Sequence, residues 1–206
     1  ELILTTPGRV IFNSEIERSL RDAVHGDAAG SHTYIKRALS KRELDSFIAL
    51  GVLNRIKKPG WRVTICCPEP AVTSMNGVTV HAQSTLAEAR SADAVIVGSG
   101  IRTREIVGEP AIMNELRPDP ARQPVAAQCS GTLVLAKLGL LGAVPACTDL
   151  TTKPWVQEAG VEVLNQPFFA KGNVATAGGC LASPYLAAWI IGRTEGSEAA
   201  ASALHY

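Results

Sequence analysis

The sequence lacks an excess of charge of either sign. Its 206 residues carry 20 Lys and Arg against 19 Asp and Glu, which gives a formal net charge of +1. This balance gives no reason to expect nucleic acid or an anionic membrane surface as a partner. No apolar run reaches the roughly 18 residues that a membrane-spanning helix needs. The first residues also lack the basic flank and the apolar length of a signal peptide.

Cysteine and histidine are also scarce. There are five cysteines, an odd number, and none of them forms a CxxC pair. We therefore expect neither a disulfide framework nor a zinc site, and we expect no other metal or cofactor. The same pattern favours a reducing, cytoplasmic compartment, in which a cysteine in a special sequence context becomes a candidate nucleophile.

Short apolar runs alternate with amphipathic segments from residue 61 onward. Alternation of strand and helix is the signature of βαβ units and a parallel sheet. We predict a single α/β domain, a three-layer α/β/α sandwich of the flavodoxin-like kind with a mostly parallel sheet. The predicted strands span 61–67, 78–82, 93–97, 124–128, 144–147, 161–164 and 173–177, and the predicted helices span 85–90, 110–116, 131–141, 153–159, 181–192 and 195–203.

The most informative segment runs from residue 125 to residue 131. An apolar strand meets Cys129, then Ser130 and Gly131, and then a helix. This is the layout of a nucleophile elbow with cysteine in place of serine. The partial positive charge at the helix N-terminus is expected to lower the pKa of the Cys129 thiol and to favour the reactive thiolate. The N–H of Ser130 would point into the same pocket and help to hold an oxyanion.

Cys129 also has a second interpretation, as one more small buried hydrophobic residue. The strand, cysteine, glycine and helix context favours the reactive role. A nucleophilic thiol usually has a partner base, but none of the four histidines follows Cys129 at a strand end, so a Cys-His-acid triad has little support. Packing is the better interpretation of the other four cysteines, Cys66, Cys67, Cys147 and Cys180.

An ordered set of segments between residues 44 and 193 resembles the DJ-1/ThiJ/PfpI family. Each segment alone is a weak signal, whereas their order along the chain is specific. The resemblance implies the class I glutamine-amidotransferase-like fold and is closest to the isonitrile-hydratase-like branch. The matching segments are 44–45 with 52–53, 60–64 with 68–70, 85–89, 94–100, 129–131 with 140–142, and 172–179.

The resemblance implies a role for four residues. Cys129 matches the family nucleophile, and the N–H groups of Gly100 and Ser130 match the pair that holds the oxyanion. Asp45 matches the acidic residue that hydrogen-bonds the thiol, and a carboxyl group in that place can act as general acid and base. Without the resemblance, Asp45 would be interpreted as a solvated residue of an acidic helical turn.

Three departures from the family pattern leave the substrate unidentified. Ser130 stands where many relatives have a histidine after the nucleophile, which argues against the peptidase-like branch. Asp149 occupies the place of the histidine in the Thr-Thr-His-Trp segment of isonitrile-hydratase-like relatives, so Asp149 is a candidate binding residue. The usual Pro-Gly-Gly has become Gly98-Ser99-Gly100.

The N-terminal part of the chain, before Asp45, departs most from the family pattern. The family opens with an apolar strand directly before the acidic residue, but residues 36–43 are too basic for a buried central strand. Residues 1–44 instead resemble a segment of the largest subunit of bacterial RNA polymerase, without its metal-binding aspartates. We predict an atypical, fused segment over 1–43 without polymerase activity, and a DJ-1/PfpI-like domain over 44–206. The first strand is either replaced by a strand predicted at 10–13 or missing.

Two functions follow from these residues. The leading prediction is a cysteine-dependent hydrolase or hydratase of a small molecule, isonitrile-hydratase-like or amidase-like, in which Cys129 attacks and Asp45 manages the proton. The alternative is a non-catalytic redox-sensing or stress protein that uses Cys129 as an oxidation switch. By analogy with relatives of this fold, we also expect a homodimer.

Overall fold

The computed structural model describes residues 43–74 and 76–205. The strand predicted at 10–13, and with it almost all of the segment 1–43, lies outside the described residues. The division of the chain at residue 43 therefore stays a prediction. Among the residues described, no helix has the length and apolar character to cross a membrane.

A four-stranded sheet forms the centre of the molecule, in the order β3-β4-β6-β5. β3 (Val95–Val97), β4 (Val125–Gln128) and β6 (Val174–Ala177) run parallel, whereas β5 (Phe168–Lys171) pairs antiparallel with β6 at the edge. The carboxyl ends of β3, β4 and β6 therefore meet at one edge of the sheet. The predicted α/β sandwich with a mostly parallel sheet is confirmed.

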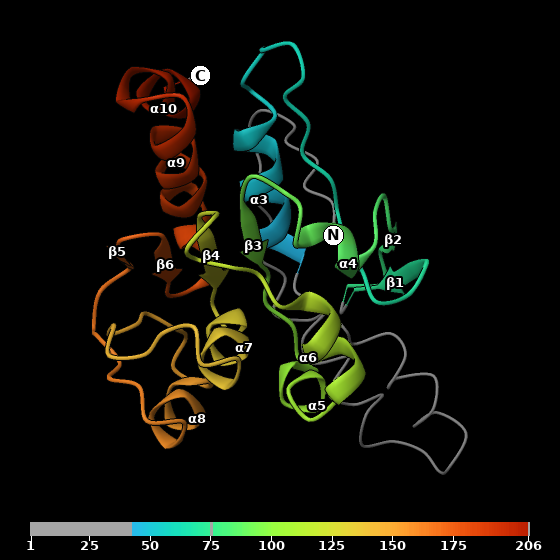
Figure 1. Cartoon of the computed structure of the whole chain (residues 1–206), viewed down its shortest axis with the longest axis vertical. Helices are drawn as coiled ribbons and strands as arrows, with labels where there is room; N and C mark the ends of the chain where they lie inside the picture. Colours follow the sequence, from blue (N-terminus) through green and yellow to red (C-terminus); the bar gives the residue numbers. More distant parts are fainter. Residues whose placement is uncertain (1–42, 75, 206) are drawn as a thin grey trace.

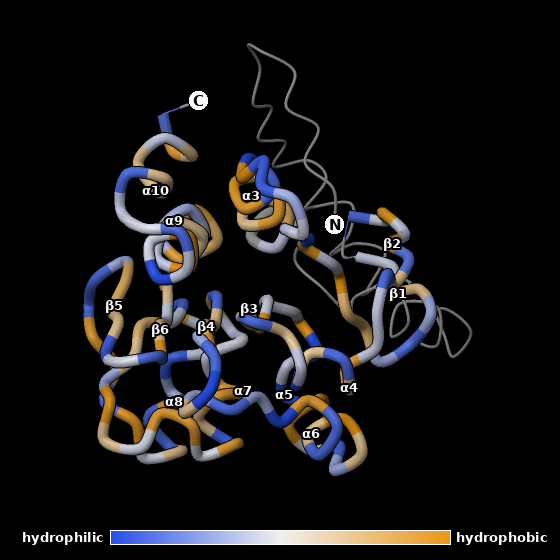
Figure 2. The backbone as a smooth tube through the Cα atoms, turned by 45° about the horizontal axis from the view of Figure 1, so that its top comes forward, coloured by the Kyte–Doolittle hydropathy of each residue, from blue (hydrophilic) through white to orange (hydrophobic). Residues whose placement is uncertain are grey.

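Helices cover both faces of this sheet (Figure 1). On one side lie α3 (Glu43–Leu53), α9 (Ser183–Thr194) and α10 (Ser197–Leu204), and on the other side lie α5 (Thr103–Ile106), α6 (Pro110–Leu116), α7 (Gly131–Lys137) and α8 (Lys153–Glu158). α4 (Leu86–Ala89) packs with α6. Figure 2 shows the same layers from a second direction.

The burial of β4 explains the layers. All four of its residues are buried, as expected for a strand that is covered on both faces. Successive side chains point to opposite faces: Ala126 packs with α3, α9 and α10, whereas Val125 and Ala127 pack with α7 and α8. The two hydrophobic cores on either side of β4 hold the elbow that follows it in place.

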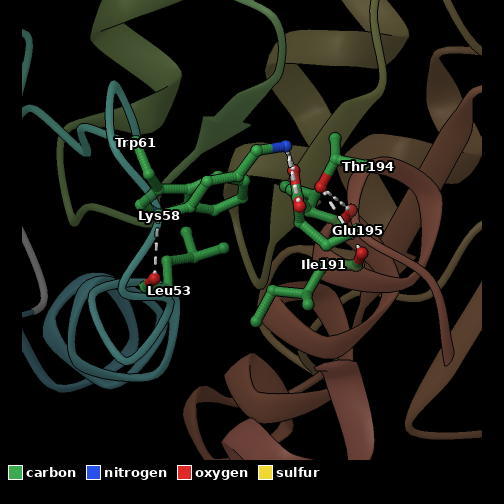
Figure 3. Close-up of polar contacts among 7 residues, drawn as sticks. Leu53, Lys58, Trp61, Ile191, Thr194 and Glu195 are labelled. Atoms are coloured by element: carbon green, nitrogen blue, oxygen red, sulfur yellow. Dashed lines mark hydrogen bonds and ion pairs between the residues drawn. The ribbon is translucent and has the colours of Figure 1, made fainter. Parts of the chain in front are cut away.

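Polar contacts also join the C-terminal end of α3 to the end of α9 on one face of the sheet (Figure 3). Lys58 forms an ion pair of 3.0 Å with Glu195, which directly follows α9. The indole Nε1 of Trp61 donates to the carbonyl oxygen of Leu53 at 3.0 Å. These contacts join the loop after α3 to the end of α9 and to the last residue of α3.

Several predicted strands are wrong. Residues 61–67, 144–147 and 161–164 contribute only the parallel bridges between Cys66 and Ser84 and between Ala146 and Val163. Residues 78–82 do contain β2 (Thr79–His81), but it pairs with β1 (Ala71–Thr73) in a separate antiparallel ribbon. Short apolar runs also occur in extended loop segments that pack against helices. Periodicity alone therefore does not distinguish such a segment from a strand.

Two further differences concern helices. α7 ends at Lys137 rather than at residue 141, because Gly139 adopts φ +72° just after the cap residue Leu138. α9 begins at Ser183, and a short 3-10 turn, η1 (Cys180–Ala182), precedes it. β1, β5 and α5 were not predicted. The helices α4, α6, α8 and α10 lie within one or two residues of their predicted positions.

Candidate active site

Cys129 lies on the predicted nucleophile elbow, between β4 and α7. Its φ is 53°, and no other non-glycine residue in the described part of the chain has a positive φ. A left-handed conformation costs free energy for any residue with a side chain, so neighbouring groups must hold the Cys129 backbone in place. The Cys129 N–H donates to the Ala177 oxygen of β6 at 2.9 Å, and the Cys129 oxygen accepts from the Thr148 hydroxyl at 2.8 Å.

The turn after Cys129 is tight enough to require glycine. A Cβ on Gly131 would lie 2.4 Å from the carbonyl oxygen of Val97 and 2.7 Å from that of Gly98. The end of β3 therefore presses directly on the first turn of α7. This close approach gives a physical reason for the glycine of the elbow.

The Asp149 carboxylate is the polar partner of the Cys129 sulfur. The thiol donates to Asp149 Oδ2 over 3.2 Å, and Oδ1 accepts the N–H groups of Thr151 and Thr152 at 3.0 Å each. Burial alone would raise the pKa of Asp149, but hydrogen bonds from Thr152, Cys129 and Thr151 outweigh it and lower the pKa. Asp149 therefore faces the thiol as a carboxylate.

The Cys129 proton stays on sulfur. Its hydrogen bond with Cys180, its burial and the negative charge of Asp149 all raise the pKa of the thiol. The lowered pKa expected from the helix N-terminus is therefore wrong for this arrangement. The hydrogen bond with Cys180, the burial of the thiol and the ionised Asp149 carboxylate together outweigh the partial charge of the short helix α7.

Cys180 was interpreted from the sequence as a packing residue, and the structure places it at the site instead. It is half-buried and hydrogen-bonds with Cys129. The side-chain amide of Gln128 donates to the Gly179 oxygen at 2.7 Å and holds the segment before Cys180 against the end of β4. The signal available in the sequence was the glycine pair after an apolar strand, which predicts a sharp turn at the same sheet edge.

Gly100 and Ser130, the predicted oxyanion pair, are in direct contact. The Gly100 N–H donates to the Ser130 hydroxyl oxygen at 3.0 Å, and that oxygen lies 2.9 Å from the hydroxyl of Thr103. The Gly100 N–H therefore already has an acceptor within the chain. Thr103, which the sequence did not single out, is the residue that completes this buried network.

Asp45 lies in the first turn of α3, and its side chain is outside the described part of the structure. The next residue, Ser46, packs against the end of β3, because a Cβ on Gly98 would lie 2.6 Å from the Ser46 hydroxyl oxygen. The backbone therefore brings Asp45 to the sheet edge where Cys129 lies. Its role as proton carrier stays a prediction.

No cluster of three or more His, Cys, Asp or Glu residues that could hold a metal ion occurs within the described ranges. The described side chains and N–H groups at this edge supply two thiols, the ionised Asp149 carboxylate, and the hydroxyl and N–H groups of Ser130, Thr103 and Gly100. Such a set suits nucleophilic attack with proton transfer.

Comparison with known proteins agrees with the fold. The DJ-1/PfpI family model matches residues 37–192 and so begins inside the segment 1–43. No curated protein matches the chain by sequence. The structure is similar to that of Schizosaccharomyces pombe DJ-1, with a TM-score of 0.67 and 15% identity over 81% of this chain and 93% of that one.

Two other solved structures show the same fold. A ThiJ/PfpI family protein from Pseudomonas syringae aligns with a TM-score of 0.72 and 16% identity, over 87% of this chain and 79% of that one. Drosophila melanogaster DJ-1beta aligns with a TM-score of 0.69 and 22% identity, over 81% and 91%. Since the family model spans most of the sequence, the chain belongs to the DJ-1/PfpI family.

Proposed function

We propose that the chain is a cysteine-dependent hydrolase or hydratase of a small molecule, with Cys129 as nucleophile and Asp149 as its proton carrier. One observation carries the proposal, the 3.2 Å contact between the Cys129 thiol and Asp149 Oδ2 at a strained elbow. A nucleophile held in hydrogen-bonding contact with a base is the arrangement that covalent catalysis needs. The family includes both cysteine-dependent enzymes and stress-response proteins, which agrees with this function and with the second one below.

The proton position sets the order of events. Because the thiol is protonated and Asp149 is ionised, attack on an electrophilic carbon forms the sulfur–carbon bond while the thiol proton passes to Oδ2. Asp149 then donates this proton to the leaving amine of an amide, or to the substrate carbon of an isonitrile. Water completes the reaction by displacing the Cys129 sulfur, which recovers its proton.

The negative charge that develops on the substrate would face Gly100 and Ser130. In this proposal the Gly100 N–H exchanges the Ser130 hydroxyl, now its acceptor at 3.0 Å, for the substrate anion. The hydroxyl keeps a partner in Thr103, at 2.9 Å, when it turns away. The oxyanion role of both residues is therefore compatible with the contacts of the resting site.

The role that the sequence assigned to Asp45 is tested against Asp149 in one experiment. Asp149→Asn and Asp45→Asn are compared with wild type in the hydrolysis or hydration of a panel of small amides and isonitriles. The proposal expects a much larger loss of kcat in Asp149→Asn. Turnover that survives Cys129→Ser would overturn the proposal. A larger loss of kcat in Asp45→Asn than in Asp149→Asn would assign the proton transfer to Asp45 instead.

A second candidate function, oxidation sensing at this site, is favoured by a separate observation. Cys180 hydrogen-bonds with Cys129, and redox-responsive cysteines often have a second, resolving thiol beside them. Exposure to a hydroperoxide followed by mass spectrometry tests it. Oxidation confined to this pair, without turnover of any amide or isonitrile, would favour sensing over catalysis.

A homodimer also belongs to this proposal. Ile101, Leu150 and Leu181 are exposed large hydrophobic residues, and each directly follows a residue of the site. Tyr185, on the first turn of α9, is exposed as well. Such side chains favour burial between two copies. Sedimentation equilibrium tests this, and Leu150→Glu is expected to shift the distribution toward monomer.

A further inference from the structure

Two thiols from different strands meet at the carboxyl edge of the sheet. Gln128 of β4 pairs in register with Ala177 of β6. Continued by one step, the register places Cys129 beside Gly178, and Cys180 follows two residues later. The hydrogen bond from the Cys129 N–H to Ala177 and the hydrogen bond from Gln128 to Gly179 hold the two strand ends together just before the cysteines.

The two cysteines differ in how deeply they are buried. Cys129 is 1% exposed, whereas Cys180 is half-buried. Gly179, which directly precedes Cys180, is exposed, so this turn reaches the surface. A small oxidant that approaches the site therefore meets the Cys180 sulfur first, and the Cys129 sulfur lies behind it with its proton directed at Asp149.

We propose that Cys129 and Cys180 form a reversible disulfide when the chain meets a hydroperoxide. In the first step the Cys180 sulfur attacks the peroxide, a sulfur–oxygen bond forms, the oxygen–oxygen bond breaks, and water or an alcohol leaves. In the second step the Cys129 sulfur attacks the Cys180 sulfenic acid and passes its proton to Asp149. The sulfur–oxygen bond breaks, and the departing hydroxide takes that proton and leaves as water.

The inference rests on the same proton transfer from Cys129 to Asp149 as the proposed function, but its electrophile is sulfur rather than carbon. The disulfide removes the nucleophile and separates it from its carboxylate, so any hydrolase activity stops. A dithiol reverses the reaction by thiol–disulfide exchange, in which the dithiol is oxidised and both cysteines are reduced. The pair would thus join the two candidate functions in one site.

Trypsin separates the cysteines in a way that identifies the product. Cys129 lies in the peptide 123–137, Cys147 in 138–171 and Cys180 in 172–193. The reduced full-length chain is treated with hydrogen peroxide at pH 7, alkylated under denaturing conditions, digested without reductant and analysed by mass spectrometry. The inference expects the linked peptides 123–137 and 172–193, and their disappearance after treatment with dithiothreitol.

Variants separate the steps. Cys129→Ser should accumulate a Cys180 sulfenic acid that dimedone traps, because the thiol that would resolve it is gone. Cys66→Ser is the matched control, because Cys66 is another half-buried cysteine outside this edge, and it should oxidise like wild type. Disulfide formation in a chain that turns over no substrate would support the inference while the hydrolase proposal fails.

Two results would overturn the inference. Sulfinic acid on Cys129 with Cys180 still alkylated would show direct oxidation without a resolving thiol, and it would leave oxidation sensing intact. Recovery of both cysteines in their reduced, alkylated form at peroxide concentrations that oxidise free cysteine would exclude the disulfide and the sensing function together.

Discussion

Cys129 and Cys147 are both buried beside β6, yet their surroundings differ. Cys129 is 1% exposed and its N–H donates to Ala177, while Cys147 is 0% exposed and its N–H donates to the Thr176 hydroxyl. Burial raises the pKa of Cys147 to about 11, and no carboxylate is among the causes of that shift. Cys129 instead has a positive φ and the Asp149 carboxylate on its sulfur.

The comparison shows that burial alone does not make a nucleophile. Both thiols hold their protons, because burial disfavours the thiolate in each case. Only the Cys129 proton has an acceptor that can take it during attack. The difference between the two cysteines lies in the elbow and the carboxylate, and each can be removed separately.

The largest expected effect comes from replacing Cys129, the proposed nucleophile. Cys129→Ser should lower kcat/KM for a small amide or isonitrile substrate roughly a thousandfold or more, because the serine hydroxyl is far less acidic. Cys147→Ser is the matched control and should retain turnover of the wild-type order. Steady-state kinetics measures both. Equal losses of kcat/KM in Cys129→Ser and Cys147→Ser would mean that both substitutions disturb the fold, and that Cys129 has no special chemical role.

Removing the Asp149 carboxylate is expected to have the next largest effect. It should change the rate of turnover and the rate of Cys129 alkylation in opposite directions. Asp149→Asn should reduce kcat about a hundredfold, because the proton loses its acceptor. The Asp149 charge raises the pKa of Cys129, so its loss should lower that pKa and increase alkylation by iodoacetamide at a given pH. Slower turnover together with faster alkylation is a signature that misfolding would not produce.

The pH profile of Cys147 serves as the internal reference for that experiment. Its alkylation should be the same in wild type and Asp149→Asn, since burial is the main cause of its raised pKa. If the Cys129 profile did not move relative to Cys147, the contact between Asp149 and the thiol would have no electrostatic consequence.

The elbow can be tested through stability. Gly131→Ala would place a methyl group 2.4 Å from the Val97 oxygen, and we expect it to lower the free energy of unfolding by about 3 kcal/mol. Gly51→Ala is the control, because nothing lies within 4 Å of a Cβ at that exposed helical position, and alanine favours helix. Urea denaturation measures both, and equal midpoints would contradict the tight packing at the elbow.

The sequence was most informative where local chemistry and fold agree. The strand, Cys129, Gly131 and helix pattern predicted the elbow, because a tight strand-to-helix turn restricts residue types locally. The buried strands β3, β4 and β6 were predicted from continuous apolar runs. Asp149 was named as a candidate binding residue through the family resemblance, whereas its contact with the sulfur depends on the loop before α8 and needed the structure.

What the sequence could not show is which segments meet. Cys180 is 51 residues from Cys129, and only the pairing of β4 with β6 brings them together. β5 is a short strand at the edge of the sheet, and its antiparallel pairing follows from the turn at Gly172, with φ +61°. Long-range register is a property of the assembled sheet, so local patterns do not determine it.

The smallest expected effect concerns the Cys147 thiol and alkaline pH. Its pKa rises from an ordinary value of 9.0 to about 11 on folding, so the folded chain binds this proton more tightly than the unfolded chain. That contribution to stability is complete below pH 9 and is lost as the pH rises toward 11. Between pH 7 and pH 10 the loss of stability should be about 1 kcal/mol.

The difference in unfolding free energy between wild type and Cys147→Ser, measured by urea denaturation at the two pH values, isolates this loss, because all other groups titrate in both chains. An alkaline loss of the same size in both would show that the buried Cys147 gains no protection from its surroundings, and the contrast with Cys129 would then rest on Asp149 alone.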